Sequence, residues 1–516
     1  MQPAVILTNG KIHAGADLDE IVDSVSIIGG RIVEVGALSQ ASRSAQTEVV
    51  DLRGHTVLPG FIDSHTHFCK YGLNLSRINL DGVTSVDKAV ASVHETVALT
   101  APGDWISGYN WDQHTLGRWP TRQDLDRVAP DNPVVLTRRD VHVVWANSKA
   151  LEMVGINGST QDPPGGQIDR NPEDGTPTGI VRETAIGLLL NAVPKPTRED
   201  WIAAIERARA RFQSFGVTSV HTMEGLDEFA TLAYLRQRGE LGLRFHTLIA
   251  KPDLDRFIEG GLRTGFGDEW IRIGPVKVFL DGTLGSQTAE MIEPFEGTST
   301  RGIVFSADDE VGPLVKKSVK AGISVAMHAI GDGAVRRAIG HFEQAPASQL
   351  RHRIEHVQLV HPDDLPRLRK LNLIGSVQPM FVISDFDVAY KYWGPRTRYA
   401  YAFKTIRDSG MKLAFGSDCP VEIPSVINAI DAACNRCAPD GRIFHKEERV
   451  SVREAIQAFT IGGAYASGEE HLKGSIEPGK LADFTVLSED PFKTSHIKGL
   501  EVVMTILGGK TVYSRL

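Results

Sequence analysis

Two histidines, His65 and His67, lie two residues apart at the end of an apolar segment, PGFIDSHTHF, at residues 59–68. Alternate side chains of a β-strand point to the same face, so this spacing turns both imidazoles to one side. Neutral imidazole nitrogens suit zinc and the neighbouring transition metals as ligands. The pair therefore predicts half of a metal site.

Further residues that bind metals or transfer protons follow separate apolar segments. His328 follows ISVAM, His356 lies in RIEHVQL, and Asp418 ends LAFGSD. Each has a structural alternative: the two histidines could be hydrogen-bonded core residues, and Asp418 could be the N-cap of a following helix. Their shared position at the ends of predicted strands favours a common metal site.

Lys277 lies within another predicted strand, PVKVFLDG. Burial of an ammonium group is costly unless the group is paired or modified. Reaction of the amine with carbon dioxide would give a carbamate, an anion whose two oxygens could bridge two cations. The alternative is a structural ion pair with Asp281 or Glu355.

Strand ends far apart in the sequence need a scaffold that brings them together. From residue 216 onward seven apolar strands alternate with helical stretches, and the segment 59–68 makes eight. Eight parallel strands close a (β/α)8 TIM barrel, in which active sites lie at the C-terminal ends of the strands. The sequence therefore predicts an α/β fold with a barrel at residues 59–466.

The two ends of the chain predict a second structure. Residues 1–58 and 467–516 both show short alternating strands with glycine turns, and neither half has enough apolar surface to form a stable sheet alone. We therefore expect these two segments to form one composite β domain. About 145 residues separate the first two barrel strands, too many for a loop, which predicts an inserted cap at about 69–196.

Composition excludes several classes of partner. The 56 basic and 64 acidic residues leave a net charge of −8 without a long run of one sign, which argues against nucleic acid or a membrane surface. No segment approaches the length of a membrane span, and four cysteines do not make a disulfide framework. We expect a cytoplasmic enzyme that acts on a small-molecule substrate and could form a homodimer.

Six motifs resemble, in their order along the chain, the amidohydrolase superfamily in its branch called amidohydrolase family 3, or YtcJ-like: PGFIDSHTHF, VKVFLDGTLGSQTA, HAIGDGA, RIEHVQ, GSDCPV and GSIEPGKLADFTVL. The resemblance implies the same barrel and a split β-sandwich. It also implies hydrolysis of carbon–nitrogen bonds other than peptide bonds, as by N-substituted formamide deformylase. The metal ligands that it implies are His65, His67, Lys277 as N6-carboxylysine, His328, His356 and Asp418.

The predicted mechanism uses hydroxide on a divalent ion, with zinc as the first choice and one or two ions according to the state of Lys277. Asp418 is predicted to accept the proton of the attacking water and deliver it to the leaving nitrogen. His221, which ends the second barrel strand, is predicted to touch the substrate and to donate to the developing oxyanion.

Predicted substrate contacts lie in the cap. Trp111, in the segment WDQ, resembles the aromatic substrate-side loop of the family, and His114 and His142 are further candidates. Several tryptophans there would suit an apolar amide substituent, although packing of the cap explains them equally well. Two other functions stay open: deamination or the opening of a cyclic amide or imide on the same barrel, and a non-catalytic binding protein that retains the fold.

Overall fold

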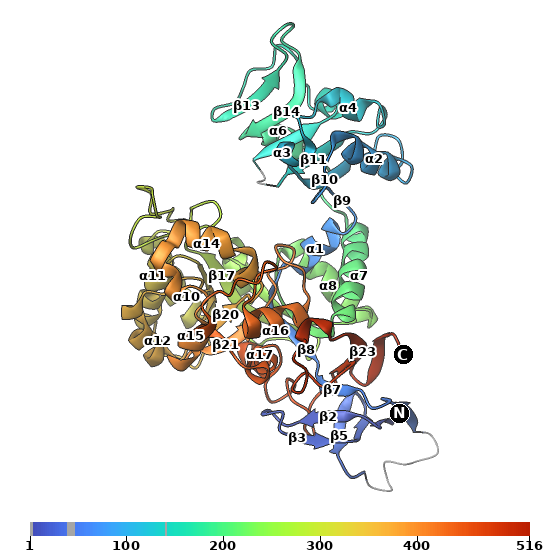
Figure 1. The fold of residues 1–516 in the computed structure, drawn as a ribbon, viewed down its shortest axis with the longest axis vertical. Helices are drawn as coiled ribbons and strands as arrows, with labels where there is room; N and C mark the ends of the chain where they lie inside the picture. The colour runs from blue at the N-terminus through green and yellow to red at the C-terminus, as the bar shows by residue number, and fades with distance from the viewer. Residues whose placement is uncertain (1–3, 39–46, 140–141) are drawn as a thin grey trace. The chain divides into compact units, whose positions relative to one another are not determined.

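The structure is a computed structural model that describes residues 4–38, 47–139 and 142–516 (Figure 1). The chain divides into two compact units. The first unit combines Met1–Cys69 with Ile205–Leu516, and the second is Lys70–Ala204. The second unit thus follows the first barrel strand, with bounds at 70 and 204 where the sequence predicts a cap at about 69–196.

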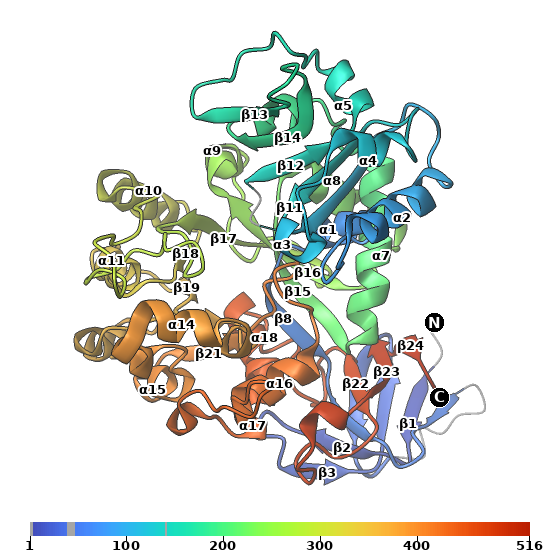
Figure 2. The ribbon, with the colours of Figure 1, turned by 45° about the horizontal axis from the view of Figure 1, so that its top comes forward.

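Eight parallel strands form the central sheet of the first unit (Figure 2), each where the sequence predicts one. The ends of the sheet meet through a parallel bridge between Thr66 in β8 and Cys419, which lies in the segment that follows β21. The predicted (β/α)8 barrel is therefore confirmed. In order around the sheet its strands are β8 (Phe61–Thr66), β15 (Val217–Glu224), β16 (Arg244–Ala250), β17 (Ile271–Phe279), β18 (Val325–Ala329), β19 (Arg353–His356), β20 (Ile374–Val377) and β21 (Lys412–Phe415).

Helices separate the barrel strands and follow the last of them. The helix α8, for example, ends at Gly239, whose left-handed conformation closes its last turn, and α17 begins with a capping box between Ser451 and Glu454. The helices of this layer are α1 (Phe68–Asn74), α7 (Arg198–Ser214), α8 (Leu226–Arg238), α9 (Leu254–Glu259), α10 (Asp308–Lys320), α11 (Asp332–Glu343), α12 (Leu365–Leu371), α13 (Phe381–Ser384), α14 (Phe386–Trp393), α15 (Phe403–Asp408), α16 (Val426–Asn435), α17 (Val452–Ala458) and α18 (Ile461–Ser467).

The two ends of the chain share the β-sandwich of the first unit, as predicted. One sheet pairs β7 of the N-terminal part with β22 of the C-terminal part, and Figure 2 shows the blue and red strands side by side. Its order is β24 (Lys510–Ser514), β23 (Val502–Leu507), β22 (Phe484–Leu487), β7 (Thr56–Pro59), β2 (Lys11–Ala14) and β3 (Glu20–Val22). The other is β5 (Arg31–Val35), β4 (Val25–Ile28), β1 (Val5–Thr8) and β6 (Glu48–Asp51).

A close backbone approach joins the sandwich to the start of the barrel. The Thr485 hydroxyl of β22 donates to the Gly216 carbonyl at 2.6 Å and accepts from the Phe61 amide at 3.2 Å. A side chain at position 216 would lie 2.4 Å from a Thr485 methyl carbon, and the residue has a φ of +81°, so glycine is required there. This contact lies at the first residue of β8 and directly before β15.

The second unit has its own mixed sheet and hydrophobic core. Apolar residues of its strands and helices, including Trp111 and Trp145, form that core. The sheet order is β13 (Gly166–Arg170), β14 (Pro177–Glu183), β12 (Val143–Ala146), β11 (Val134–Arg138), β10 (Ile106–Trp111) and β9 (Ile78–Asn79). The helices are α2 (Val86–Val97), α3 (Gln113–Leu116), α4 (Arg122–Asp126), α5 (Ser148–Met153) and α6 (Ile186–Leu190). Among the described residues of the chain, no helix has the length and apolar character that crossing a membrane requires.

Candidate metal centre

The predicted metal ligands of the first unit lie at or just beyond the C-terminal ends of barrel strands. They are His65 in β8 and His67 directly after it, Lys277 in β17, His328 in β18, His356 at the end of β19, and Asp418 after β21. Because these strands are parallel neighbours in one barrel, their ends share one rim. The barrel thus gathers side chains that are up to 353 positions apart.

Three of these side chains converge closely enough to hold one ion. His65, His356 and Asp418 each offer a ligand atom, and the three atoms lie within 4.8 Å of one another. All three residues are buried. Two imidazole nitrogens and a carboxylate oxygen form a donor set that suits zinc and other transition metals.

His67 and His328 lie at the edges of this group. His67 Nε2 is 3.5 Å from Asp418 Oδ1, to which His65 Nε2 lies at 3.4 Å. The His328 ring has its centroid 4.4 Å from that of His356. The structure therefore brings all four predicted histidines and Asp418 into one neighbourhood.

The second ring nitrogen of three histidines is held by an acceptor. His65 Nδ1 donates to Glu355 Oε2 at 2.6 Å, and His356 Nδ1 donates to Gln378 Oε1 at 2.9 Å. His328 Nε2 donates to the Gly282 carbonyl at 3.0 Å. Such outer acceptors are typical of metal-binding histidines, because they fix the tautomer and the ring orientation. The residues present thus fit a divalent ion.

The backbone at the site adopts conformations that non-glycine residues rarely take. His356 has a φ of 74° and Asp418 a φ of 57°. Residues held in this region carry strain that the surrounding structure must oppose. Around Asp418 that support comes from Asp63, which accepts from the Ser417 amide and hydroxyl, and from the Asp418 amide, which donates to the His65 carbonyl at 2.7 Å.

Burial sets the charge of the histidines. It lowers the pKa of His328 to about 3 and holds the pKa values of His356 and His67 below the ordinary 6.5. Burial opposes ionisation of Asp418, but the adjacent His65 and hydrogen bonds with His65 and His67 outweigh it and keep the Asp418 pKa well below 3.8. Neutral imidazoles beside an ionised carboxylate are the protonation states that metal binding requires.

Lys277 is buried in β17 without an ion pair to any carboxylate that the structure describes. Its Nζ lies 4.9 Å from the ring centroid of Phe279. The two carboxylates that the sequence offered as partners are otherwise engaged: Glu355 with Arg353, and Asp281 with backbone amides that include Gly331. Burial lowers the pKa of Lys277 to about 8. The structural ion pair is therefore not formed.

The structure buries His221 beside Arg353. Its side chain has no exposed surface, and its Nδ1 lies 2.9 Å from a guanidinium nitrogen of Arg353. Its ring packs against His246 at 4.8 Å between centroids. Since a guanidinium only donates, His221 Nδ1 accepts this hydrogen bond. His221 Nε2 then carries the ring proton and has no hydrogen-bond partner among the described residues, so donation to an oxyanion stays a prediction.

The predicted substrate contacts belong to the second unit. Trp111 has no exposed surface and donates to the Leu136 carbonyl at 2.7 Å, so it packs in that unit's core, the alternative that the sequence left open. His114 in α3 is exposed, and His142 is exposed and donates to Glu183 at 2.9 Å. For these two histidines substrate contact stays a prediction.

The N-cap alternative for Asp418 is wrong. The next helix, α16, begins at Val426, and its N-cap is Ser425, whose hydroxyl accepts from the Asn428 amide. Asp418 is instead directed into the histidine group, as its distances to His65 and His67 show.

Sequence reasoning missed three outer residues of the site: Arg353, Glu355 and Gln378. A weak signal for the first two was present, because arginine and glutamate two apart in a buried strand face the same side and must pair with something. Gln378 carries no such signal. Its amide donates to the Ser376 carbonyl at 3.3 Å, which turns its oxygen toward His356.

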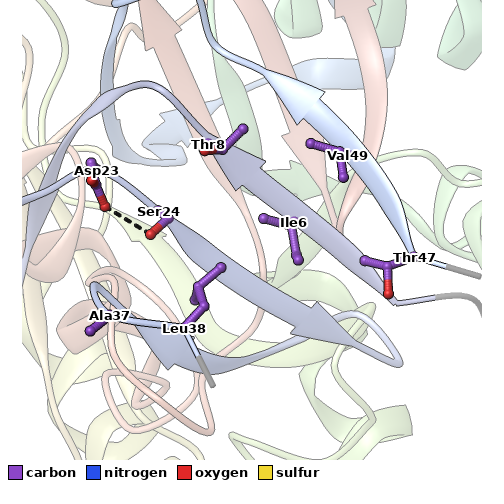
Figure 3. Close-up of a pocket in the computed structure, with 8 residues that line it drawn as sticks. All are labelled: Ile6, Thr8, Asp23, Ser24, Ala37, Leu38, Thr47 and Val49. Atoms are coloured by element: carbon purple, nitrogen blue, oxygen red, sulfur yellow. Dashed lines mark hydrogen bonds between the residues drawn. The ribbon is translucent and has the colours of Figure 1, made fainter. Parts of the chain in front are cut away.

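A hollow elsewhere in the first unit has no comparable chemistry. It has a volume of about 500 Å³ and lies on the four-stranded sheet of the sandwich, where Figure 3 shows its eight lining residues. Asp23 is the single titratable residue among them, and it accepts a hydrogen bond from Ser24 at 2.8 Å. We therefore place the chemistry at the barrel rim.

A parallel eight-stranded barrel whose rim carries a buried His–His–Asp group that could hold a metal ion is an arrangement that suits metal-dependent hydrolysis. The family described as "Amidohydrolase family" matches residues 48–513, which is most of the chain. The chain belongs to this family, and the resemblance seen in its motifs is confirmed. It is an amidohydrolase, an enzyme of the class that acts on carbon–nitrogen bonds other than peptide bonds.

Three comparisons describe its relatives. The putative amidohydrolase YtcJ of Bacillus subtilis is 32% identical, with 98% of each chain covered. The N-substituted formamide deformylase of Arthrobacter pascens is 28% identical over 99% of this chain and 98% of its own. A solved structure of an uncharacterized metal-dependent hydrolase from Pyrococcus furiosus is 34% identical, covers 95% of this chain and 100% of its own, and superposes with a TM-score of 0.81.

Proposed function

We propose that this chain is a metal-dependent hydrolase that cleaves the carbon–nitrogen bond of a small N-substituted amide, with N-substituted formamides as the first substrates to test. The convergence of ligand atoms from His65, His356 and Asp418 within 4.8 Å carries the proposal. The similarity to a formamide deformylase over nearly the whole of both chains supports the choice of substrate.

The proposed ion is zinc, with His65, His67, His328, His356 and Asp418 as the protein ligands. A divalent ion held there would polarise the substrate carbonyl and make hydroxide available near neutral pH. Asp418, which is ionised, accepts the proton of the attacking water at a carboxylate oxygen. It then returns that proton to the leaving nitrogen as the carbon–nitrogen bond breaks.

The test of this function is a substrate panel assayed on metal-replete protein. The panel contains N-substituted formamides, the matching acetamides, a cyclic imide and an amino-substituted heterocycle. We expect formate release from the formamides, its loss on chelation, and its return when zinc is added back. Hydrolysis that survives complete removal of metal would overturn the proposal, and activity confined to the imide or the heterocycle would reassign the substrate class.

We further propose that Lys277 is carboxylated, which would allow two ions to bind. The step joins the neutral amine nitrogen to the carbon of carbon dioxide and releases one proton. Burial lowers the pKa of Lys277 to about 8, so a larger share of its amine is neutral at pH 7 than in an ordinary lysine. The carbamate should therefore form readily at neutral pH and be lost as the pH falls and the amine is protonated.

Protein incubated with ¹³C-labelled bicarbonate should show a carbamate carbon resonance that disappears on acidification. Lys277→Met should lack the resonance and bind fewer ions per chain. Lys473→Met is the matched control, because Lys473 is also buried but is paired with Glu469 at 3.0 Å. A spectrum of the parent protein without the resonance, or one that Lys277→Met leaves unchanged, would contradict the assignment.

A further inference from the structure

We propose that Glu355, held by Arg353, is a positioning residue that selects the ring nitrogen His65 presents to the metal. This inference rests on the proposed function. Glu355 is not one of the predicted ligands, and its side chain has no exposed surface. It acts on the metal only through the hydrogen bond between its Oε2 and His65 Nδ1, which measures 2.6 Å.

Arg353 fixes the orientation of Glu355 by contacting both of its carboxylate oxygens. Its Nε donates to Glu355 Oε1 at 2.8 Å, and one terminal nitrogen donates to Oε2 at 3.0 Å. This two-point contact prevents rotation of the carboxylate plane. Both side chains are fully buried, so water does not compete for these hydrogen bonds.

Arg353 is itself anchored to three other strands of the barrel, of which only β20 is next to its own strand β19. Its terminal nitrogens donate to the Ser64 carbonyl of β8 at 2.6 Å, to the Ser376 hydroxyl of β20 at 2.8 Å, and to His221 Nδ1 of β15 at 2.9 Å. A guanidinium with its donors used in this way has little freedom to move. The buried His221 thus contributes to holding the pair in place.

The consequence for His65 follows from the chemistry of the acceptor. A carboxylate paired with arginine only accepts hydrogen bonds, so a His65 ring that leaves Nε2 free for an ion must carry its proton on Nδ1. Nε2 then carries its lone pair on the side where Asp418 Oδ1 lies, 3.4 Å away. With the carboxylate removed, the other tautomer, which has a proton where the ion should bind, becomes accessible.

Glu355→Gln is the sharpest test. Arg353 will draw the amide oxygen toward itself, which turns the amide NH₂ toward His65 and makes Nδ1 an acceptor. The proton of His65 then moves to Nε2, the wrong tautomer for binding. We expect the affinity for Co²⁺, measured by competition with a chelator, to fall about 10- to 100-fold. The d–d absorption bands of the Co²⁺-loaded protein should change as well.

Asp483→Asn is the matched control. Asp483 makes an equally buried two-point pair with Arg244, with contacts of 2.6 and 2.9 Å, and contacts no predicted ligand. Both variants leave a buried arginine without its charge partner and should unfold at lower temperature than the parent. Only Glu355→Gln should weaken Co²⁺ binding. The double variant Arg353→Met/Glu355→Gln leaves no unpaired charge, and we expect it to keep the weakened binding while it regains stability.

The outcomes separate this inference from the proposed function. Equal Co²⁺ affinity and equal spectra in the parent and in Glu355→Gln would overturn the positioning role while leaving the metal site intact. If Asp483→Asn weakened Co²⁺ binding to the same degree, general destabilisation would explain the loss. That result would also overturn the positioning role of Glu355. A parent protein that binds no Co²⁺ would overturn the proposed function and this inference together.

Discussion

Asn in place of Asp418 should lower kcat/KM for the best amide substrate by about 10³-fold, within the range that positioned acid–base groups contribute. The amide of asparagine has nearly the shape of the carboxylate but cannot take a proton from water and return it to the leaving nitrogen. Asparagine also tolerates a positive φ, so the conformation at φ 57° should survive the change. Steady-state kinetics on zinc-loaded protein measure the effect.

Metal content must be measured with the rate, because Asp418 is also a predicted ligand. If the variant retains its zinc and loses turnover, the loss belongs to proton transfer. Asp364→Asn is the matched control, since Asp364 is a buried carboxylate that pairs with Arg336 and Arg367 in the helical layer. It should keep the parent rate. Parent-like hydrolysis by Asp418→Asn would show that the proton-shuttle assignment is wrong.

Replacement of His356 by Asn should remove the metal and reduce hydrolysis to background. His356 and His65 supply two of the three possible ligand atoms that lie within 4.8 Å of one another. Loss of either imidazole therefore leaves too few strong metal ligands. We expect each variant, His65→Asn and His356→Asn, to lose zinc during dialysis against a weak chelator that leaves the parent loaded. Asparagine suits position 356 because the backbone φ there is 74°.

The control for this loss is another buried histidine. His13 in the β-sandwich is 2% exposed and its Nδ1 lies 3.1 Å from the Leu18 carbonyl, but it lies outside the barrel rim. His13→Asn should therefore destabilise the fold without changing zinc content. Full metal retention in His356→Asn, measured by elemental analysis, would disprove the role of this residue as a ligand.

Most of the fold could be predicted from local patterns. Each barrel strand is a short apolar run bounded by polar or glycine-containing segments, and such runs can be recognised without knowing their partners. Eight such runs, separated by helical stretches, are compatible with few architectures. The long interval after the first strand likewise required a separate unit, because so long a loop is rare in a compact structure.

Some residues of the candidate site could be predicted from the sequence, and others could not. The position of His65 and His67 at a strand end was sufficient to expect an inward pair. His221 also ends a strand pattern and follows the same logic, yet it lies buried against Arg353. Nothing local separates the two cases, because the arginine that engages His221 is 132 positions away. The prediction of substrate contact for Trp111 could not be checked locally either. Its burial depends on the packing of its whole unit.

The amino-acid sequence by itself determined the order of the strands along the chain and the residue types at their ends. It therefore determined the kind of chemistry available to this protein. These properties follow from periodicity and composition, which can be recognised within segments of a few residues. Only the tertiary structure decided which ring nitrogen of His65, His328 and His356 is engaged by an acceptor, that Arg353 rather than Lys277 pairs with Glu355, and that His221 lies buried against Arg353. Those outcomes depend on contacts between distant strands, whose distances are set by closure of the barrel.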